Sequence, residues 1–269
     1  AYKLHHPNLL HLNHFDVFGQ CPFLVMPYCP KGSSASLKGK MSEKQIWRFI
    51  RDVSCGLMFL HNQNPPIIHQ DIKPDNILIN DENRYMITDF GISARIRSTL
   101  RRNQGQESSG GTLAYMGPER FGPSPAPIMA SDIWSLGATM YELLTGMPPY
   151  GDHGGVLQKN GADIPLINED FSQELKDIIY KCLALNPWDR PTARQIADYT
   201  SQHINGSPVP FSLSNNSHDT LQEEEDKTHE DSISAHSSDI NKMSPYQDKG
   251  KRKKVIVVAA ITAIFATIV

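Results

Sequence analysis

The feature that most constrains this chain is the run His69-Gln70-Asp71-Ile72-Lys73-Pro74-Asp75-Asn76, followed after a short stretch by Asp89-Phe90-Gly91. The run places an aspartate, a lysine and an asparagine in one loop, and a second aspartate follows a predicted hairpin. This grouping is typical of sites that move a phosphoryl group from a magnesium-bound nucleotide. One carboxylate orients the attacking hydroxyl, the lysine offsets charge on the moving group, and the asparagine and second aspartate hold the metal.

Length and charge narrow the class of protein. The chain has 269 residues, enough for one large domain or two small ones, and its net charge is −3. This charge implies no general attraction to nucleic acid, so we expect no nucleic-acid partner. The cysteines lack the spacing of a metal site or a disulfide framework, which favours a reducing compartment. They are Cys21, Cys29, Cys55 and Cys182.

Hydrophobic patterning predicts a mixture of strands and helices. Ser42 is the predicted N-cap of a helix that runs to about His61, with apolar residues at the three-four spacing of a buried face. Other segments show shorter patterns bounded by turn residues. The predicted strands cover residues 8–18, 23–29, 77–79 and 85–87, and the other predicted helices cover 131–145, 172–185 and 192–200. Residues 92–111 are predicted to form a polar surface loop.

The C-terminal part differs sharply in composition. Residues 201–248 are rich in serine and acidic side chains, so we expect a disordered linker. Residues 249–254 are basic, and residues 255–269 carry no charge. As a helix those 15 residues would span only about 22 Å of a roughly 30 Å hydrocarbon core. We expect a transmembrane helix truncated at Val269, with the basic residues and the preceding domain in the cytoplasm.

With these motifs in hand, residues 1–200 resemble the catalytic domain of eukaryotic-type Ser/Thr protein kinases. The resemblance implies an α+β, protein-kinase-like fold, mainly the helical large lobe with the hinge and the last strands of the small lobe. Several specific motifs occur in the family order. They are His69–Asn76, Asp89–Gly91, Gly111–Glu119, Ser131–Gly137 and Asn186–Pro191.

The resemblance assigns roles to the reacting residues. Asp71 corresponds to the base that accepts the proton of the substrate hydroxyl, and Lys73 to the contact with the γ-phosphate. A lysine at this position is typical of Ser/Thr-directed members. Asn76 and Asp89 correspond to the Mg²⁺ ligands, and Thr112 would hydrogen-bond near the base and the lysine.

The resemblance also implies a nucleotide site and a supporting frame. Met26 would be the gatekeeper, the Pro27 carbonyl and the Cys29 amide would face the adenine edge, and Leu78 would lie under the ring. ATP and Mg²⁺ are therefore the expected cofactors. The frame would consist of a Glu119–Arg190 ion pair, Asp132 bracing the catalytic loop, and the motif residues His69, Phe90 and Gly91.

Three departures from the family pattern stand out. Gln70 replaces the arginine that usually captures a phosphate on the activation loop, which puts control by loop phosphorylation in question. Gly117 replaces the usual alanine, a change that we expect to be tolerated. In the family pattern the glycine-rich loop, the strand lysine and the helix glutamate would lie before Ala1. We therefore expect little kinase activity from the chain as written.

The sequence thus predicts a membrane-tethered Ser/Thr protein kinase that binds ATP and phosphorylates protein hydroxyls. A homodimer is an expectation by analogy with single-pass receptors only. The alternative is a pseudokinase or scaffold that binds partners through the large lobe. Gln70 and the absence of the glycine-rich loop and the strand lysine favour the alternative. The complete set of Asp71, Lys73, Asn76 and Asp89 opposes it.

Overall fold

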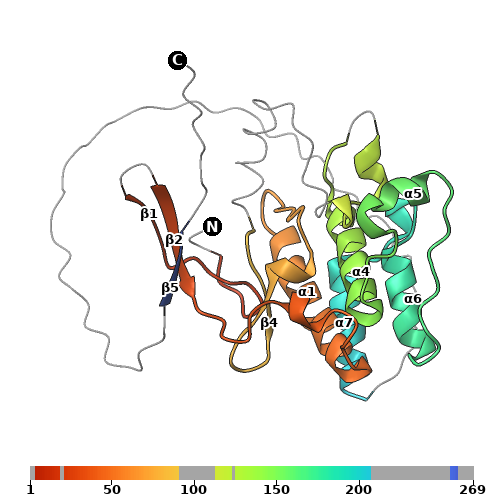
Figure 1. Cartoon of the computed structure of the whole chain (residues 1–269), viewed down its shortest axis with the longest axis horizontal. Coiled ribbons are helices and arrows are strands. Elements are labelled where there is room, and N and C mark those ends of the chain that lie inside the picture. The colour runs from red at the N-terminus through yellow and green to blue at the C-terminus, as the bar shows by residue number, and fades with distance from the viewer. Residues whose placement is uncertain (1–3, 19–20, 91–112, 123–124, 207–254, 260–269) are drawn as a thin grey trace, which may run out of the picture. The chain divides into compact units, whose positions relative to one another are not determined.

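The computed structural model describes residues 4–18, 21–90, 113–122, 125–206 and 255–259 (Figure 1). The strands are β1 (His14–Phe18), β2 (Cys21–Pro27), β3 (Ile77–Ile79), β4 (Tyr85–Ile87) and β5 (Val255–Ala259). The helices are α1 (Glu43–His61), α4 (Met129–Thr145), α5 (Gly155–Lys159), α6 (Gln173–Cys182) and α7 (Ala193–Ile204). Helices combined with small antiparallel sheets confirm the predicted α+β class.

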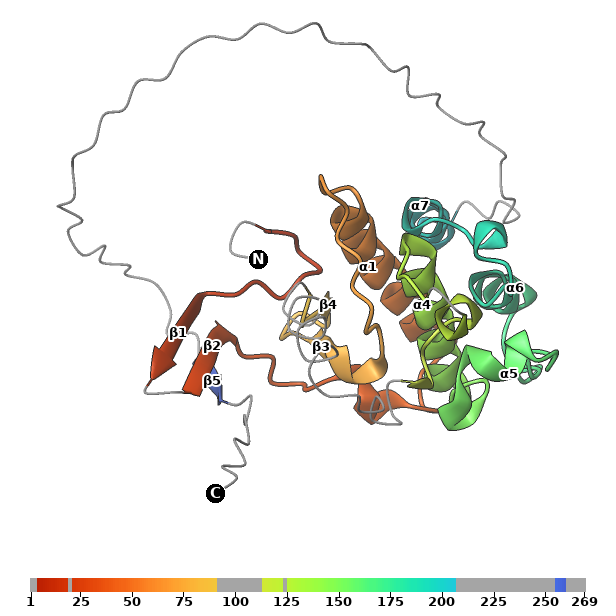
Figure 2. The ribbon, with the colours of Figure 1, turned by 90° about the horizontal axis from the view of Figure 1, so that it is seen from above.

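Helix α1 begins and ends where the sequence predicts. The backbone N–H of Ser42 donates to the Oε1 atom of Gln45 at 2.9 Å, which satisfies a donor ahead of the first turn. The helix packs against α7 and α4 (Figure 2), and its predicted apolar face is buried. That face consists of Ile46, Phe49, Ile50, Val53, Leu57 and Leu60, each with 0% exposure.

Helix α4 is buried along nearly its whole length, and this explains its apolar sequence. It starts at Met129, two residues before the predicted start, and ends at Thr145 as predicted. Gly146 adopts a left-handed conformation with φ of 91°, and its N–H donates to the Glu142 carbonyl. A glycine suits this C-terminal cap because it lacks a Cβ atom.

The last two helices deviate from the predicted bounds in opposite directions. Helix α6 covers Gln173–Cys182, three residues short of the predicted end. Helix α7 runs to Ile204, so the expected linker is wrong for residues 201–204. The extra turn is held because the His203 ring stacks on Trp47 of α1, with ring centroids 3.9 Å apart. Residues 207–248 lie outside the described part of the chain.

The strands form two antiparallel sheets, β1-β2-β5 and β3-β4. The first predicted strand is too long, because residues 8–13 do not belong to β1. Leu9 instead forms a bridge with Ile87, and the Leu10 N–H donates to the Ile87 carbonyl at 2.8 Å. Strand β2 ends at Pro27, so the predicted strand over 23–29 is two residues too long at its end.

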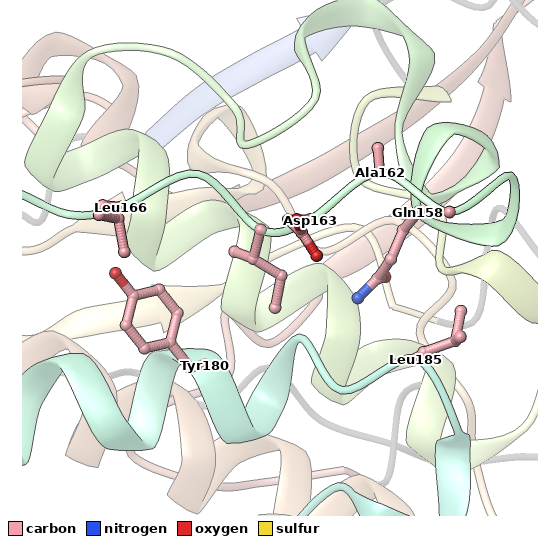
Figure 3. A pocket seen from close by; sticks show the side chains of 8 residues that line it. Gln158, Ala162, Asp163, Leu166, Tyr180 and Leu185 are labelled. Atoms are coloured by element: carbon pink, nitrogen blue, oxygen red, sulfur yellow. The ribbon is translucent and has the colours of Figure 1, made fainter.

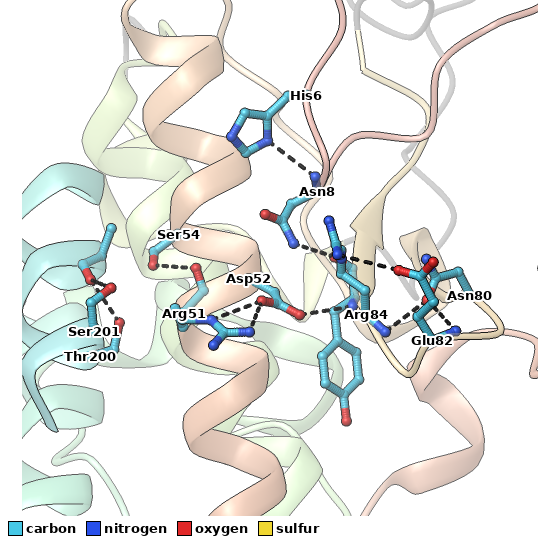
Figure 4. A network of polar contacts seen from close by, with 12 residues as sticks. His6, Asn8, Arg51, Asp52, Ser54, Asn80, Glu82, Arg84, Thr200 and Ser201 are labelled. Carbon is cyan, nitrogen blue, oxygen red and sulfur yellow. Dashed lines mark hydrogen bonds and ion pairs between the residues drawn. The ribbon is translucent and has the colours of Figure 1, made fainter. Parts of the chain in front are cut away.

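Buried polar contacts fasten this early segment and β4 to α1 (Figure 4). The Asn8 side chain donates to the Tyr85 carbonyl at 3.1 Å, and the Tyr85 N–H donates to Asp52 of α1 at 3.1 Å. Asp52 also accepts from the Arg51 guanidinium at 2.7 Å. The hairpin that follows the catalytic loop is therefore tied to the longest helix.

The expected transmembrane helix is wrong for residues 255–259, which form β5. This strand pairs antiparallel with β2, with Val257 opposite Val25. Valine and isoleucine favour extended backbone, and β2 offers an edge with unpaired hydrogen-bonding groups. In the described part of the chain, no helix is long and apolar enough to cross a bilayer. Residues 249–254 and 260–269 lie outside that part.

Candidate active site

The backbone of the predicted catalytic loop is held by Asp132 of α4, which is fully buried. Its Oδ2 atom accepts from the His69 N–H at 2.8 Å and from the His61 ring at 2.9 Å. Its Oδ1 atom accepts from the Gln70 N–H at 2.7 Å. Gln70 has a φ of 68°, a conformation that non-glycine residues rarely adopt. Asp132 therefore braces the loop through backbone groups, as the resemblance implied.

The His69 ring connects this loop to the end of β4. Its Nδ1 atom accepts from the Asp71 N–H at 3.2 Å, and its Nε2 atom contacts the Thr88 carbonyl at 2.8 Å. A carbonyl can only accept, so this pattern assigns the proton to Nε2. The buried imidazole fixes the backbone of Asp71 relative to the residue before Asp89.

Three of the predicted site residues come together around one carboxylate. The Asn76 amide nitrogen donates to the Asp71 carbonyl at 2.8 Å and to Asp71 Oδ2 at 3.0 Å. The Lys73 ammonium lies 3.4 Å from the other carboxylate oxygen, Oδ1. The Asp71 side chain keeps 14% exposure and that of Lys73 keeps 20%. The carboxylate is thus held on two sides while remaining accessible to a reactant.

Asp89 is brought close to this group by the hairpin. The Thr88 N–H donates to the Asn76 carbonyl at 3.0 Å. Because Asp89 directly follows Thr88, this hydrogen bond places the Asp89 backbone near Asn76. Asp89, Phe90 and Met26 line one small cavity together with Leu10, His11, Leu12 and Thr88. The predicted gatekeeper and the predicted metal ligand therefore border the same space.

The segment after β2 approaches β3, where Leu78 lies. Leu78 forms a bridge with Ser33, and the Ile79 N–H donates to the Gly32 carbonyl at 2.9 Å. Cys29 is buried, and burial followed by the negative charge of Asp81 raises the pKa of its thiol. Pro27 ends β2. The structure thus brings Leu78 beside Ser33, four residues after the predicted adenine contact Cys29.

Glu119 and Arg190 form a bidentate ion pair. The guanidinium donates to the two carboxylate oxygens at 2.8 and 3.2 Å, and it also donates to the Ala130 carbonyl at 2.8 Å. Burial would raise the pKa of Glu119, but the hydrogen bonds and charge of Arg190 outweigh it and hold that pKa below its ordinary value. The pair joins the segment before α4 to the turn before α7.

Sequence reasoning missed a second buried network beside the site. The Tyr115 hydroxyl donates to Glu142 of α4, and Lys38 lies 2.9 Å from the same carboxylate. Burial and the carboxylate raise the pKa of Tyr115 strongly. The Ser135 hydroxyl donates to the Tyr115 carbonyl at 2.6 Å. These partners lie far apart in the sequence, as does His61 from Asp132, so no local spacing could have indicated them.

Two predicted residues, Gly91 and Thr112, lie outside the described residues, as does the predicted loop over 92–111. Within the described ranges, no cluster of three or more His, Cys, Asp or Glu side chains forms a metal site. A cavity of about 490 Å³ has none of the predicted catalytic residues in its lining (Figure 3). It is bordered by α6 and the segment after α5, and its lining includes Asp163, Leu166, Tyr180 and Leu185.

Comparisons with known proteins agree with this geometry. The family model described as "Protein kinase domain" matches residues 1–200. Mitogen-activated protein kinase kinase kinase YODA of Arabidopsis thaliana is 32% identical over 204 residues, which is 73% of this chain and 22% of the relative. Sporulation-specific protein 1 of Saccharomyces cerevisiae is 36% identical over 188 residues, 66% of this chain and 37% of the relative.

A third relative, serine/threonine-protein kinase GIN4 of Saccharomyces cerevisiae, is 31% identical over 246 residues, 80% of this chain and 21% of the relative. The chain thus spans well under half the length of each of these relatives. The family match itself covers most of the chain and contains all the site residues described above. The chain therefore belongs to the protein kinase domain family.

Proposed function

We propose that this chain is the catalytic part of an ATP-dependent protein serine/threonine kinase. The observation that carries the proposal is the Asp71 carboxylate, held between Lys73 and Asn76 on a backbone braced by Asp132 and His69. A general base must lie where a hydroxyl can reach it and must keep its geometry. The partial exposure and double support of Asp71 meet both needs.

In this proposal each residue has one task. Asp71 orients the substrate hydroxyl and accepts its proton, while Lys73 offsets negative charge on the transferred group. Asn76 holds the orientation of the Asp71 side chain through its amide nitrogen. The segment Leu113–Glu119, fixed by the Glu119–Arg190 pair, receives the protein substrate. Thr112 would support the base from the start of that segment.

The residues present fit a magnesium-bound nucleotide. The amide nitrogen of Asn76 is committed to Asp71, which leaves its oxygen as the atom for a metal. Asp89 lies next to the residue bonded to Asn76. Mg²⁺ prefers oxygen ligands and commonly uses one or two carboxylates with substrate phosphates. When bound, Mg²⁺ would neutralise phosphate charge. The adenine would be held by Met26, Pro27, Cys29 and Leu78.

The pseudokinase or scaffold function is the second candidate, and the observation that favours it is Gln70. The substitution does not disturb the contact with Asp132, because Gln70 makes that contact through its backbone N–H. The hydrogen bond from residue 70 to Asp132 therefore does not depend on which side chain occupies this position. A scaffold has no physical need for a base, a lysine and two oxygen ligands in one place, so we favour the enzyme.

Location and partners are further proposals. A single-pass membrane protein with a cytoplasmic kinase domain is supported by the uncharged stretch 255–269 and the basic stretch 249–254. It requires residues 255–259 to leave strand β5. A protein substrate with a serine or threonine hydroxyl follows from the proposed chemistry. A homodimer rests on analogy alone.

The test of the proposed activity is the substitution Asp71→Asn in the full-length protein. We expect kcat for peptide phosphorylation to fall by about 10²- to 10⁴-fold with nucleotide affinity nearly unchanged. Asp75→Asn is the matched control, since Asp75 is an exposed aspartate of the same loop and should keep full activity. Phosphotransfer that survives Asp71→Asn would show that the base is wrongly assigned.

The metal role of Asp89 is tested separately. Asp89→Asn should weaken binding of the nucleotide in the presence of Mg²⁺ and leave binding without Mg²⁺ little changed. Thermal shift of the wild-type protein with ATP, with and without Mg²⁺, distinguishes the two candidate functions. A shift that depends on the metal supports the kinase, and no shift in either condition supports the scaffold.

A further inference from the structure

Two adjacent glycines, Gly154 and Gly155, touch the backbone of the segment Leu113–Pro118. Gly154 has φ of 56° and ψ of −153°, and a Cβ atom there would lie 2.0 Å from the Leu113 carbonyl oxygen. A Cβ atom on Gly155 would lie 2.4 Å from the Pro118 nitrogen. Both contacts are with backbone, which cannot move aside as a flexible side chain can. Only glycine fits at these two positions.

Hydrogen bonds join the same two parts of the chain. The Gly155 N–H donates to the Met116 carbonyl at 2.8 Å. At the other end of α5, the Lys159 ammonium donates to the Phe121 carbonyl at 2.8 Å. The first and last residues of α5 are therefore both tied to the segment that ends at Phe121. A shift of α5 would move this segment with it.

The other supports of the segment are of a different kind. On the α4 side, the Ser135 hydroxyl holds the Tyr115 carbonyl and Glu142 holds the Tyr115 hydroxyl. These contacts use side chains, which can change rotamer at modest cost. The glycine contact joins backbone to backbone with no room to spare. It is a separate support of the segment, beside the Glu119–Arg190 pair and the Tyr115 contacts.

We propose that Gly154 and Gly155 are positioning residues that set how the protein substrate is seated on Leu113–Pro118. The inference rests on the proposed function, in which this segment receives the substrate. A displacement of about 1 Å in a reacting complex can cost on the order of 100-fold in rate. A side chain at Gly154 would push the Leu113 carbonyl by more than that. Substrate binding and orientation would suffer, while the nucleotide contacts would not.

The experiment compares Gly154→Ala with Gly151→Ala in the full-length protein, using a peptide substrate and ATP. Both glycines have φ of 56°, but a Cβ atom on Gly151 would meet nothing within 4 Å. Gly151→Ala therefore places a side chain at a φ of 56° without the contact with a neighbouring backbone. We expect Gly154→Ala to raise the peptide KM by about tenfold or more, with the ATP KM unchanged, and Gly151→Ala to change neither.

Hydrogen–deuterium exchange of residues 113–121 gives a second readout that needs no activity. Gly154→Ala should speed exchange there, and Gly151→Ala should not. If the wild-type protein phosphorylates no peptide, the proposed function fails while the exchange data still test the packing. Equal peptide KM values for the two variants, with faster exchange in Gly154→Ala alone, would overturn the positioning role.

Lys159→Met keeps the inference testable if Gly154→Ala does not fold. This change removes only the exposed bond to the Phe121 carbonyl. We expect a rise of about twofold to threefold in the peptide KM and no change in the ATP KM. A peptide KM equal to that of the wild type would then count against α5 as the support of the segment.

Discussion

At the scale of single residues, the site depends on a buried carboxylate that does no chemistry. Asp132 has 0% exposure, and its burial would be costly without partners. Two backbone N–H groups and the His61 ring satisfy it, and in return they fix the loop that carries Asp71. Because the contact at position 70 is made by backbone, Gln70 serves as well there as arginine would. The substitution therefore leaves the hydrogen bond that braces the loop intact.

His6 should make the stability of the protein depend on pH. Its Nδ1 atom accepts from the Asn8 N–H at 3.1 Å (Figure 4), and its ring stacks on that of Phe59. Burial, and then the charge of Arg84, lower the pKa of His6 below its ordinary value. The unfolded chain therefore binds the proton more readily. The contribution of neutral His6 to the stability of the fold is fully present above about pH 6.5. It is lost as the pH falls through the pKa that His6 has in the folded protein.

The measurement is the urea midpoint at about pH 7.5 and about pH 5.5 for the wild type and His6→Gln. We expect the wild type to lose more stability between the two pH values than His6→Gln loses. His153→Gln, which changes an exposed histidine, should behave as the wild type does. An equal pH response in wild type and His6→Gln would contradict the assigned role.

The sequence could predict only some of this detail. Asp71, Lys73 and Asn76 were predictable as a group because they lie within six consecutive residues of one loop. The resemblance also predicted that Asp132 braces this loop. The contact of Asp132 with His61 and the partners of Glu142 were not predicted, because these contacts join residues that are distant in the chain. A buried acid in an apolar helix indicates that partners exist, but hydropathy does not identify them.

At the scale of elements, α1 was predicted well because its capping residue and its periodic face agree. The strands were predicted less well. Alternating apolar residues over 8–18 satisfied the strand pattern, yet Leu9 and Leu10 bind Ile87 instead of continuing β1. Period-two patterning shows that backbone is extended and says nothing of its partner. Where an extended segment changes partner, the pattern overestimates the length of the strand.

Gly56 shows how closely α1 approaches its neighbours. A Cβ atom there would lie 2.8 Å from the Ile87 side chain and 3.0 Å from the Asn8 carbonyl oxygen. Alanine in a helix would favour folding by up to about 1 kcal/mol over glycine. Overpacking a tight site typically costs about 1–3 kcal/mol, and here the Asn8 backbone cannot yield freely. We expect Gly56→Ala to destabilise the protein on balance.

Urea unfolding of Gly56→Ala measures the net effect. Gly122→Ala is the control, because the nearest atom to its Cβ position is 3.7 Å away. The control should change stability by less than about 0.5 kcal/mol. A stabilised Gly56→Ala variant would mean that helix propensity outweighs the contact with Asn8.

At the scale of the whole molecule, its location depends on what residues 255–259 form. In β5 they continue a sheet at the edge of β2, and in a membrane helix they would be withdrawn from it. Composition alone favours neither, because valine and isoleucine are common in strands and in membrane helices alike. The two conformations exclude each other for these residues. Evidence about the backbone hydrogen bonds of β5 is therefore evidence for or against a membrane helix at this stretch.

Proline substitutions at Val257 and Val258 separate the two conformations. In an antiparallel strand, neighbouring residues direct their N–H groups alternately toward the partner and away from it. Only one of the two prolines therefore removes a bond to β2, and the other is tolerated as on any edge strand. Strand β5 predicts that Val257→Pro and Val258→Pro lower the urea midpoint unequally and that the wild-type protein does not float with lipid vesicles, and this result would overturn the proposed membrane location. Equal effects together with flotation would mean that the stretch is a membrane helix, because proline disturbs neighbouring positions of a helix alike.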